Sequence, residues 1–307
     1  MKALNIRHFC QVSAVILEDT PLPIPDPQQV IVRIVAASVN PLDLKIMTGQ
    51  KQVAFPVDFP YTLGTDFAGL IETIGGDVTG FKYGDRVAGR LNPRTGGAFA
   101  EYVTVSADAL SIIPAGVSDE LASALPTAGG TAYQALISVG QLTKGQHVLI
   151  HAGAGGVGSF AVQLAKQAGA YVVATASEGN LDMVRELGAD VVLDYRNEEL
   201  LQHVKGMHLV LDTRGGETLE RSWPTLRSGG TIVSIVDNTI ESRGDIQGVF
   251  TAIKHDASVL TTLLQEVDAK RLRVILDSTH TLDTAHIALD KLAAGHARGK
   301  VVIRTSN

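Results

Sequence analysis

The chain has 307 residues, of which 45% are hydrophobic and 19% charged, and its formal net charge is −6. This is a globular composition, and the acidic balance argues against nucleic acid or an anionic membrane as the main partner. Cys10 is the only cysteine, which excludes an intrachain disulfide and a zinc site made of four cysteines. No stretch reaches the roughly 20 apolar residues of a membrane span, and the start lacks a signal-peptide core. We therefore expect a cytoplasmic protein.

The first third of the chain contains short β-type runs separated by turn residues. The runs 31–38, 70–75 and 100–105 mix β-branched or aromatic residues at strand-like spacing. Prolines and Gly-Gly or Gly-Asp pairs interrupt them. This pattern predicts a mainly antiparallel, barrel-like domain.

The pattern changes near residue 120, where apolar strands begin to alternate with helices. Residues 147–153 and 171–177 read as strands, and 159–170 and 181–189 as amphipathic helices. Strands that are apolar on both faces indicate a parallel sheet covered by helices on both sides, and hence an α/β protein with a doubly wound sheet.

A further helix is predicted over 258–272, after which the runs 273–277 and 300–304 are again β-like. Their composition suggests that they return to the first domain. We therefore expect a catalytic domain made of residues 1–120 and 273–307, and a nucleotide-binding domain made of residues 121–272.

A glycine loop, residues 153–158, lies between a predicted strand and a predicted helix and fits the pattern G-x-G-x-x-G. In this pattern Gly153 permits a tight turn, Gly155 admits the pyrophosphate close to the backbone, and Gly158 lets the helix pack on the strand. The amides around Gly156 and Val157, at the helix N-terminus, favour phosphate. The alternative is a glycine-rich turn without a ligand, but the flanking pattern favours dinucleotide binding.

The end of the second strand of this domain indicates which dinucleotide is bound. Sites that prefer NAD place an acidic residue there, on the adenosine ribose, whereas this strand ends in Ala176 and Ser177. This favours NADPH, because a carboxylate would repel a 2′-phosphate. Glu178 follows immediately, and we interpret it as a solvated turn residue; the next basic residue is Arg185.

Taken together, these segments resemble the zinc-free quinone oxidoreductases of the medium-chain dehydrogenase/reductase superfamily, the group that includes zeta-crystallin. The resemblance rests on segments spread over essentially the whole chain: 39–49, 63–69, 84–87, 96–102, 124–136, 151–166, 186–190 and 295–303. It implies a GroES-like, β-barrel-type catalytic domain built from both chain ends, with a Rossmann domain inserted between them.

The resemblance also implies that the catalytic metal site is lost. Where zinc-dependent relatives carry their first cysteine ligand this chain has Asn40, and where they carry a histidine it has Thr65. Cys10 lies elsewhere, so the second cysteine has no counterpart. Catalytic zinc needs about three protein ligands, and we therefore assign no metal-binding residue.

By their positions in the matched segments, the resemblance implies catalytic roles for Asn40 and Asp43. Asn40 is expected to donate a hydrogen bond to a substrate carbonyl, although Asn40-Pro41 could simply be a turn, and Asp43 to orient the loop. Thr127 and Thr131 resemble residues that lie against the nicotinamide and the phosphates; Thr127 could instead cap the following helix.

Further cofactor contacts are implied for four residues. Tyr195 resembles a tyrosine beside the adenosine phosphate, with a plain surface aromatic as the alternative, and the backbone at Ile235 is expected near the carboxamide. Arg298 and Lys300 resemble cofactor or substrate-site contacts, although basic residues flanking a glycine often form a solvated turn. His151, beside the glycine loop, is interpreted as a packing residue.

The resemblance implies transfer of hydride from NADPH to a small electrophilic carbonyl compound or quinone. Tyr61 is considered as a proton donor only because it lies near a matched segment. The alternatives are a non-catalytic, crystallin-like NADPH-binding protein and an enoyl-thioester reductase. A homodimer is expected, through an edge strand at 249–253 that could equally be buried within one subunit.

Overall fold

The computed structural model describes residues 1–254, 256–295 and 297–305 and divides the chain into two compact units. Unit 1 comprises residues 1–127 and 255–307, and unit 2 comprises residues 128–254. Among the described residues, no helix is both long and apolar enough to cross a bilayer.

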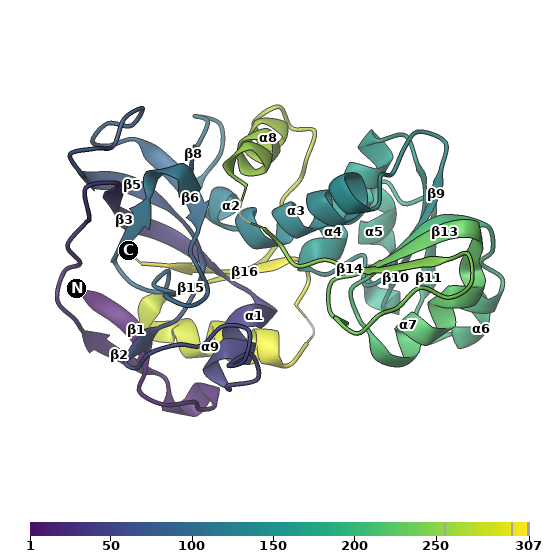
Figure 1. Ribbon diagram of the computed structural model, residues 1–307, viewed down its shortest axis with the longest axis horizontal. Helices are drawn as coiled ribbons and strands as arrows, with labels where there is room; N and C mark the ends of the chain where they lie inside the picture. Colours follow the sequence, from purple (N-terminus) through teal and green to yellow (C-terminus); the bar gives the residue numbers. More distant parts are fainter. Residues whose placement is uncertain (255, 296, 306–307) are drawn as a thin grey trace. The chain divides into compact units, whose positions relative to one another are not determined.

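Unit 1 is built on two sheets (Figure 1). One has three strands in the order β2-β1-β4; the other has seven, in the order β15-β16-β3-β5-β6-β8, with β7 also paired to β3. All pairings are antiparallel except β15 with β16. The strands are β1 (Lys2–Ile6), β2 (Ile16–Asp19), β3 (Gln29–Val39), β4 (Tyr61–Thr62), β5 (Asp66–Ile74), β6 (Arg86–Arg90), β7 (Tyr102–Ser106), β8 (Leu110–Ile112), β15 (Leu276–Thr281) and β16 (Lys300–Arg304). The helices are α1 (Pro41–Met47), α2 (Asp119–Ser123), α8 (Ala257–Asp268) and α9 (Ala285–Ala293).

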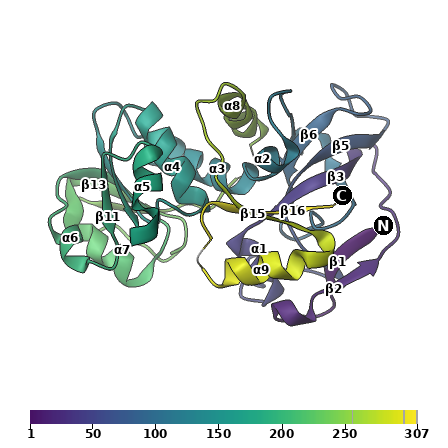
Figure 2. The same ribbon diagram turned by 180° about the vertical axis from the view of Figure 1, so that it is seen from behind.

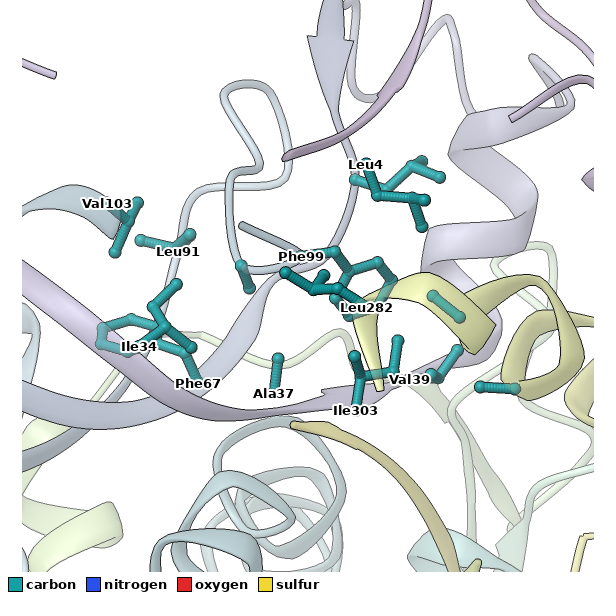
Figure 3. Close-up of a cluster of buried hydrophobic side chains, with 14 of the residues drawn as sticks. Leu4, Ile34, Ala37, Val39, Phe67, Leu91, Phe99, Val103, Leu282 and Ile303 are labelled. Carbon is teal, nitrogen blue, oxygen red and sulfur yellow. The ribbon is translucent and has the colours of Figure 1, made fainter. Parts of the chain in front are cut away.

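The core of unit 1 joins the two ends of the chain. Phe67 and Phe99 are fully buried, together with Ile34 from β3 and Ile303 from β16 (Figure 3). Strand β16 pairs with β3, with Val301 opposite Val39. The expectation that the C-terminal strands return to the first domain is therefore confirmed.

The expected domain boundaries need correction, because α8 belongs to unit 1 and not to the nucleotide-binding domain. Its first carbonyl, of Ala257, accepts a hydrogen bond from Ser111 Oγ at 2.9 Å, and Thr261 Oγ1 donates to Ser111 Oγ at 3.0 Å. At its other end Asp268 accepts from the Gly116 amide at 3.1 Å. The sequence shows that this helix has an apolar face but not which sheet that face covers.

Unit 2 is a doubly wound parallel sheet with the strand order β11-β10-β9-β12-β13-β14, as expected. Helices α4 and α5 cover one face of this sheet, and α6 and α7 cover the other (Figures 1 and 2). The strands are β9 (His147–Ile150), β10 (Tyr171–Ala176), β11 (Val191–Asp194), β12 (Met207–Asp212), β13 (Leu226–Ser234) and β14 (Gln247–Phe250). The helices are α4 (Gly156–Gln167), α5 (Leu181–Glu186), α6 (Glu198–Gln202) and α7 (Gly216–Ser222); α3 (Pro126–Tyr133) and a π-helix (Gln134–Val139) precede β9.

Strand β14 forms an edge of this sheet and, among the residues that the structure describes, pairs only with β13. The segment expected to supply an edge strand, 249–253, overlaps the observed strand, but β14 begins at Gln247 and already ends at Phe250, three positions before the end of the expected segment. Whether this edge pairs with a second copy stays a prediction.

Candidate functional site

A polar cluster in unit 1 consists of four buried residues, Asn40, Asp43, Asp66 and Lys300, and the partly buried Thr127. Neighbouring strands bring it together: β3 ends just before Asn40, β5 begins at Asp66, and β16 begins at Lys300. Asn40, Asp43, Asp66 and Lys300 are each at most 4% exposed. Ionisable groups at such depth are stable only when they are paired or hydrogen-bonded.

Asp66 accepts three hydrogen bonds within the cluster. Asn40 Nδ2 donates to its Oδ2 at 3.0 Å, and Thr127 donates from its amide at 2.9 Å and from its hydroxyl at 2.6 Å. The Thr127 hydroxyl in turn accepts from Arg90 Nε at 2.9 Å. Thr127 is therefore held by protein groups in the first turn of α3, where Asp66 and not Thr127 accepts from a helix amide. Its cofactor contact stays a prediction.

Lys300 places an ammonium group inside the cluster. Its Nζ donates to the Val39 carbonyl at 3.0 Å and to Asn40 Oδ1. Burial lowers the pKa of Lys300, and the charges of Asp66 and Asp43 act in the opposite direction. A solvated turn is therefore the wrong interpretation of Lys300.

Asn40 has an internal role in this arrangement. Its Oδ1 accepts from Lys300, while its Nδ2 donates to Asp66 and, at 3.4 Å, to the Ser38 carbonyl. A hydrogen bond from Asn40 to a substrate would have to replace one of these contacts. The catalytic role expected for Asn40 stays a prediction, and the structure supplies a structural role for the same side chain.

Asp43 lies in the first turn of α1, where its Oδ2 accepts from the Asn40 amide at 2.8 Å. This bond confirms that Asp43 orients the turn that enters the helix. Its other oxygen, Oδ1, is buried and has no hydrogen-bond partner. Burial raises the pKa of Asp43 to about 7, with a further rise from the charge of Asp66.

Thr65 lies within segment 63–69, one of the segments that carry the family resemblance, and Tyr61 lies just before it. The Tyr61 hydroxyl donates to the Pro93 carbonyl at 2.9 Å, and burial, followed by the charge of Asp43, raises its pKa. Both features make Tyr61 a poor proton donor near neutral pH. Thr65 is fully buried, and its Oγ1 has no hydrogen-bond partner.

Unit 2 contributes the glycine loop, which the structure places between β9 and α4. Gly155 is the N-cap of α4 and no side chain caps the helix there, so the first amides of α4 have no partner within the helix. A Cβ on Gly158 would lie 2.1 Å from the Ala152 carbonyl oxygen, and one on Gly153 would lie 3.0 Å from Val184. Gly153 and Gly158 therefore allow close packing of the turn, and Gly155 has no side chain at the helix N-terminus, where a pyrophosphate has to approach the backbone.

The second strand of unit 2, β10, ends beside the third, β11. Ser177 follows β10, and its hydroxyl accepts from Asn180 Nδ2 at 2.9 Å. Tyr195 donates its amide to the Ala176 carbonyl at 3.1 Å, and its side chain is 56% exposed. The guanidinium of Arg196 lies 5.4 Å from the centre of the Tyr195 ring.

Arg196 was missed by the sequence analysis, which considered only basic residues that follow Ser177 directly along the chain. The signal lies in the pairing of parallel strands, which sets Ala176 opposite Asp194 and so brings the residues after β11 to the end of β10. An exposed guanidinium with an aromatic neighbour at this position is suited to a phosphate group.

In unit 2, a buried carboxyl group, that of Asp212, holds the end of β13 in place. Asp212 accepts from Ser234 Oγ at 2.7 Å and from the amides of Arg214 and Gly215. The Ile235 amide donates to the Asp212 carbonyl at 3.0 Å. Because its amide is already bonded, Ile235 can contact the carboxamide of the nicotinamide only through its own backbone carbonyl. This contact stays a prediction.

Three remaining residues have different surroundings. Thr131 is buried in unit 2, and Arg298 is exposed, with its amide donating to Asp277 at 2.8 Å. The His151 ring contacts the hydroxyls of Thr175, at 3.2 Å, and Ser222, at 2.8 Å. Burial lowers the pKa of His151 to about 4. These contacts agree with its interpretation as a packing residue.

Comparisons with known proteins cover nearly the whole chain. A family model described as an alcohol dehydrogenase GroES-like domain matches residues 26–115, and one described as a zinc-binding dehydrogenase matches residues 187–303. A chloroplastic quinone-oxidoreductase homolog of Spinacia oleracea is 33% identical, covering 94% of this chain and 93% of its own.

Two further proteins are similar over comparable lengths. A mitochondrial NAD(P)H oxidoreductase of Homo sapiens is 33% identical over 90% of this chain and 82% of its own. The structure of the quinone oxidoreductase from Coxiella burnetii superposes with a TM-score of 0.93 at 33% identity, covering 100% of this chain and 99% of that one. Although one matching family model is described as zinc-binding, the part of this chain that the structure describes has no group of three or more His, Cys, Asp or Glu side chains arranged to hold a metal ion.

Proposed function

Because the chain belongs to the quinone oxidoreductase family of the medium-chain dehydrogenases/reductases, we propose that it transfers hydride from NADPH to a quinone or another conjugated carbonyl compound without a metal ion. It is an oxidoreductase with a nicotinamide cofactor. The observation that carries the proposal is the glycine loop, in which Gly155 leaves the N-terminus of α4 without a side chain and Gly158 lets α4 pack closely against the preceding turn.

The preference for NADPH is supported by the end of β10. Ala176 and Ser177 place no carboxylate there, and Arg196 offers an exposed guanidinium beside Tyr195. The Ser177 hydroxyl and Arg196 are suited to the 2′-phosphate that distinguishes NADPH from NADH, because that phosphate is a doubly charged acceptor of hydrogen bonds.

Independence from zinc is supported by the polar cluster. Asn40 and Thr65 stand where zinc-dependent relatives carry ligands, and neither is a good zinc ligand. The Lys300 ammonium already contacts Asn40 Oδ1. A divalent cation next to Asn40 would be repelled by this charge at short range in a medium of low dielectric constant.

In this proposal NADPH supplies the hydride when it is bound, and the chain supplies binding and electrostatics. The glycine loop holds the pyrophosphate, while Ser177 and Arg196 bind the 2′-phosphate at the adenosine end and so distinguish NADPH from NADH. The polar cluster keeps an ammonium and two carboxyl groups at fixed positions in the core of unit 1, where charges act strongly because water is excluded.

The test is oxidation of NADPH and NADH by the purified chain with four acceptors: a benzoquinone, a naphthoquinone, a 2-alkenal and a saturated ketone. We expect turnover with the quinones or the alkenal, faster with NADPH, and none with the saturated ketone. Tight binding of NADPH without turnover of any acceptor would contradict the proposal in favour of a non-catalytic protein. Turnover of an enoyl thioester alone would replace the substrate class.

We also propose that two copies of the chain associate through β14, whose outer edge has no partner strand within the described chain. An unpaired edge that contains Val249 and the partly exposed Phe250 can pair with its twofold mate. Light scattering should report a dimer, and Val249→Pro should give a monomer. A monomeric wild type would contradict the proposed dimer.

A cytoplasmic location stays a prediction. Of the compared relatives, one is chloroplastic and one is mitochondrial.

A further inference from the structure

The sheet of unit 2 consists of two halves, and the features proposed above for cofactor binding all lie on one of them. The strand order β11-β10-β9-β12-β13-β14 is that of a dinucleotide-binding sheet, and the strands run parallel, so their carboxyl ends share one edge. The glycine loop, Ser177 and Arg196 follow β9, β10 and β11. A dinucleotide lies across both halves of such a sheet, so its nicotinamide end is expected over the carboxyl ends of β12 and β13.

One side chain at this edge, the carboxyl group of Asp212 at the end of β12, connects the turns that follow β12 and β13. Asp212 is fully buried, and its Oδ1 accepts from the amides of Arg214, at 2.9 Å, and Gly215, at 2.8 Å. Its Oδ2 accepts from Ser234 Oγ at 2.7 Å, and its carbonyl accepts from the Ile235 amide at 3.0 Å. Asp212 therefore joins the two turns through four hydrogen bonds.

Ser234 extends this connection into the turn after β13. It is fully buried, and its Oγ accepts from the amides of Val236, at 3.3 Å, and Asp237, at 3.0 Å. The Val236 side chain lies against the turn after β12, where a Cβ on Gly215 would be 3.3 Å from Val236 Cγ2. Gly215 also has a φ of 70°, a conformation that favours glycine. The two turns thus form one hydrogen-bonded and packed unit.

We propose that Asp212 is a positioning residue for the nicotinamide end of NADPH. This inference rests on the proposed function, because it names the group that aligns the cofactor of that reaction. The Asp212 side chain is fully buried, so it acts through the backbone of residues 235–237, whose amides bond to Asp212 and Ser234. Hydride transfer needs the donor and acceptor carbons at a defined distance and angle, so a displaced turn lowers the rate as well as the affinity.

Strand β13 carries a second serine–aspartate pair at its other end, which offers an internal contrast. There the Ser228 hydroxyl donates to Asp245, and both residues are exposed. Water can replace an exposed hydrogen bond at little cost, whereas the loss of one partner leaves a buried group unsatisfied. Ligands of such sheets bind at the carboxyl ends of the strands, and the Ser228 pair lies at the amino end of β13. The pair of Ser234 and Asp212 is therefore the one expected to affect the cofactor.

The test compares two ligands, NADPH and adenosine 2′,5′-bisphosphate, which has the adenosine and the 2′-phosphate but no nicotinamide. In Ser234→Ala we expect the Kd of NADPH to rise about tenfold, and that of the bisphosphate to stay within about twofold of the wild-type value. Isothermal titration calorimetry measures both. With the quinone or enal that the wild type reduces, kcat at saturating NADPH should fall about tenfold, without a change in the KM of the acceptor.

Two further variants sharpen the test. Asp212→Asn keeps an oxygen for the amides of Arg214 and Gly215 but places an N–H where Ser234 needs an acceptor, so it should give the same pattern. Ser228→Ala makes the matched change at the other end of β13 and should leave both affinities and kcat unchanged. Equal losses of affinity for both ligands in Ser234→Ala, or no loss for either, would overturn the proposal.

The two affinities are measured without an acceptor, so this proposal and the proposed function can fail separately. A wild type that binds NADPH but reduces no acceptor would overturn the proposed function, while the ratio of the two affinities in Ser234→Ala would still decide for or against the role of Asp212. A wild type that does not bind NADPH would overturn both.

Discussion

The polar cluster of unit 1 and the glycine loop of unit 2 are built in opposite ways. The cluster joins side chains from segments up to 260 positions apart, and most of their polar atoms already have partners within the protein. The loop is made of consecutive residues whose glycines contribute by lacking side chains, and the amides at the start of α4 have no capping side chain. Removing a charge should therefore damage the cluster, and adding atoms should damage the loop.

The largest effect is expected for Lys300→Met, which removes the ammonium and leaves Asn40 Oδ1, the Val39 carbonyl and two buried carboxyls uncompensated. We expect the free energy of unfolding to fall by about 3–5 kcal/mol, the size of effect typical when a buried charge is left uncompensated. Denaturant titration measures this change, with Lys82→Met, at an exposed lysine, as the control. Equal stability of the two variants would show that the cluster does not hold unit 1 together.

A second buried polar group, His151, extends the comparison to the core of unit 2. Its folded-state pKa is about 4 against an ordinary value of 6.5, so the unfolded chain gains a proton first as pH falls. Stability should therefore decrease by up to about 3 kcal/mol from pH 6.5 to pH 4. This slope should be smaller in His151→Gln but not in His203→Gln, at an exposed histidine. Parallel stability curves for the wild type and His151→Gln would contradict the assignment.

For the glycine loop, the sharpest test is Gly158→Ala. The new Cβ would lie 2.1 Å from the Ala152 carbonyl oxygen, so the turn has to shift away from the geometry that admits a pyrophosphate. We expect NADPH to bind about 100-fold more weakly, which corresponds to about 2.7 kcal/mol. Gly179→Ala is the matched control, because a Cβ there meets nothing within 4 Å. Unchanged affinity in Gly158→Ala, measured by quenching of protein fluorescence, would contradict the role of the loop.

A smaller effect is expected at the adenosine end, where Arg196 and Ser177 are exposed or half-buried. Arg196→Ala should weaken NADPH by about tenfold, because it removes one charge-assisted contact, and should leave NADH nearly unchanged. Arg94→Ala, at an exposed arginine of unit 1, is the control. Titration of both cofactors decides the matter, and a parallel loss of NADPH and NADH affinity would show that Arg196 does not select the 2′-phosphate.

The sequence predicted those features that depend on neighbouring residues. The strand–loop–helix around Gly153 to Gly158 is local, and the order of apolar strands and amphipathic helices indicated the doubly wound sheet. The boundaries failed at α8, because an apolar helix face does not identify the sheet that it covers. The β-like return of the C-terminus was expected from composition, and its pairing with β3 confirmed it.

The parts of the site that the sequence could not supply depend on pairing between distant segments. Lys300 was expected at a cofactor contact or a solvated turn, but β16 pairing places it opposite the start of α1. Arg196 follows β11, and it lies near the end of β10 because these two strands pair in parallel. The unpaired Oδ1 of Asp43 reflects the packing of four strands around one helix turn, which no spacing of residues along the chain reveals.

The central claim is that this chain reduces a conjugated carbonyl compound with NADPH and without a metal ion. The most direct measurement is the rate of NADPH oxidation by a quinone after exhaustive chelation, with the metal content of the same sample determined by mass spectrometry. The account predicts undiminished turnover at a zinc content far below one per chain. Loss of turnover on chelation that is restored by added zinc would contradict it.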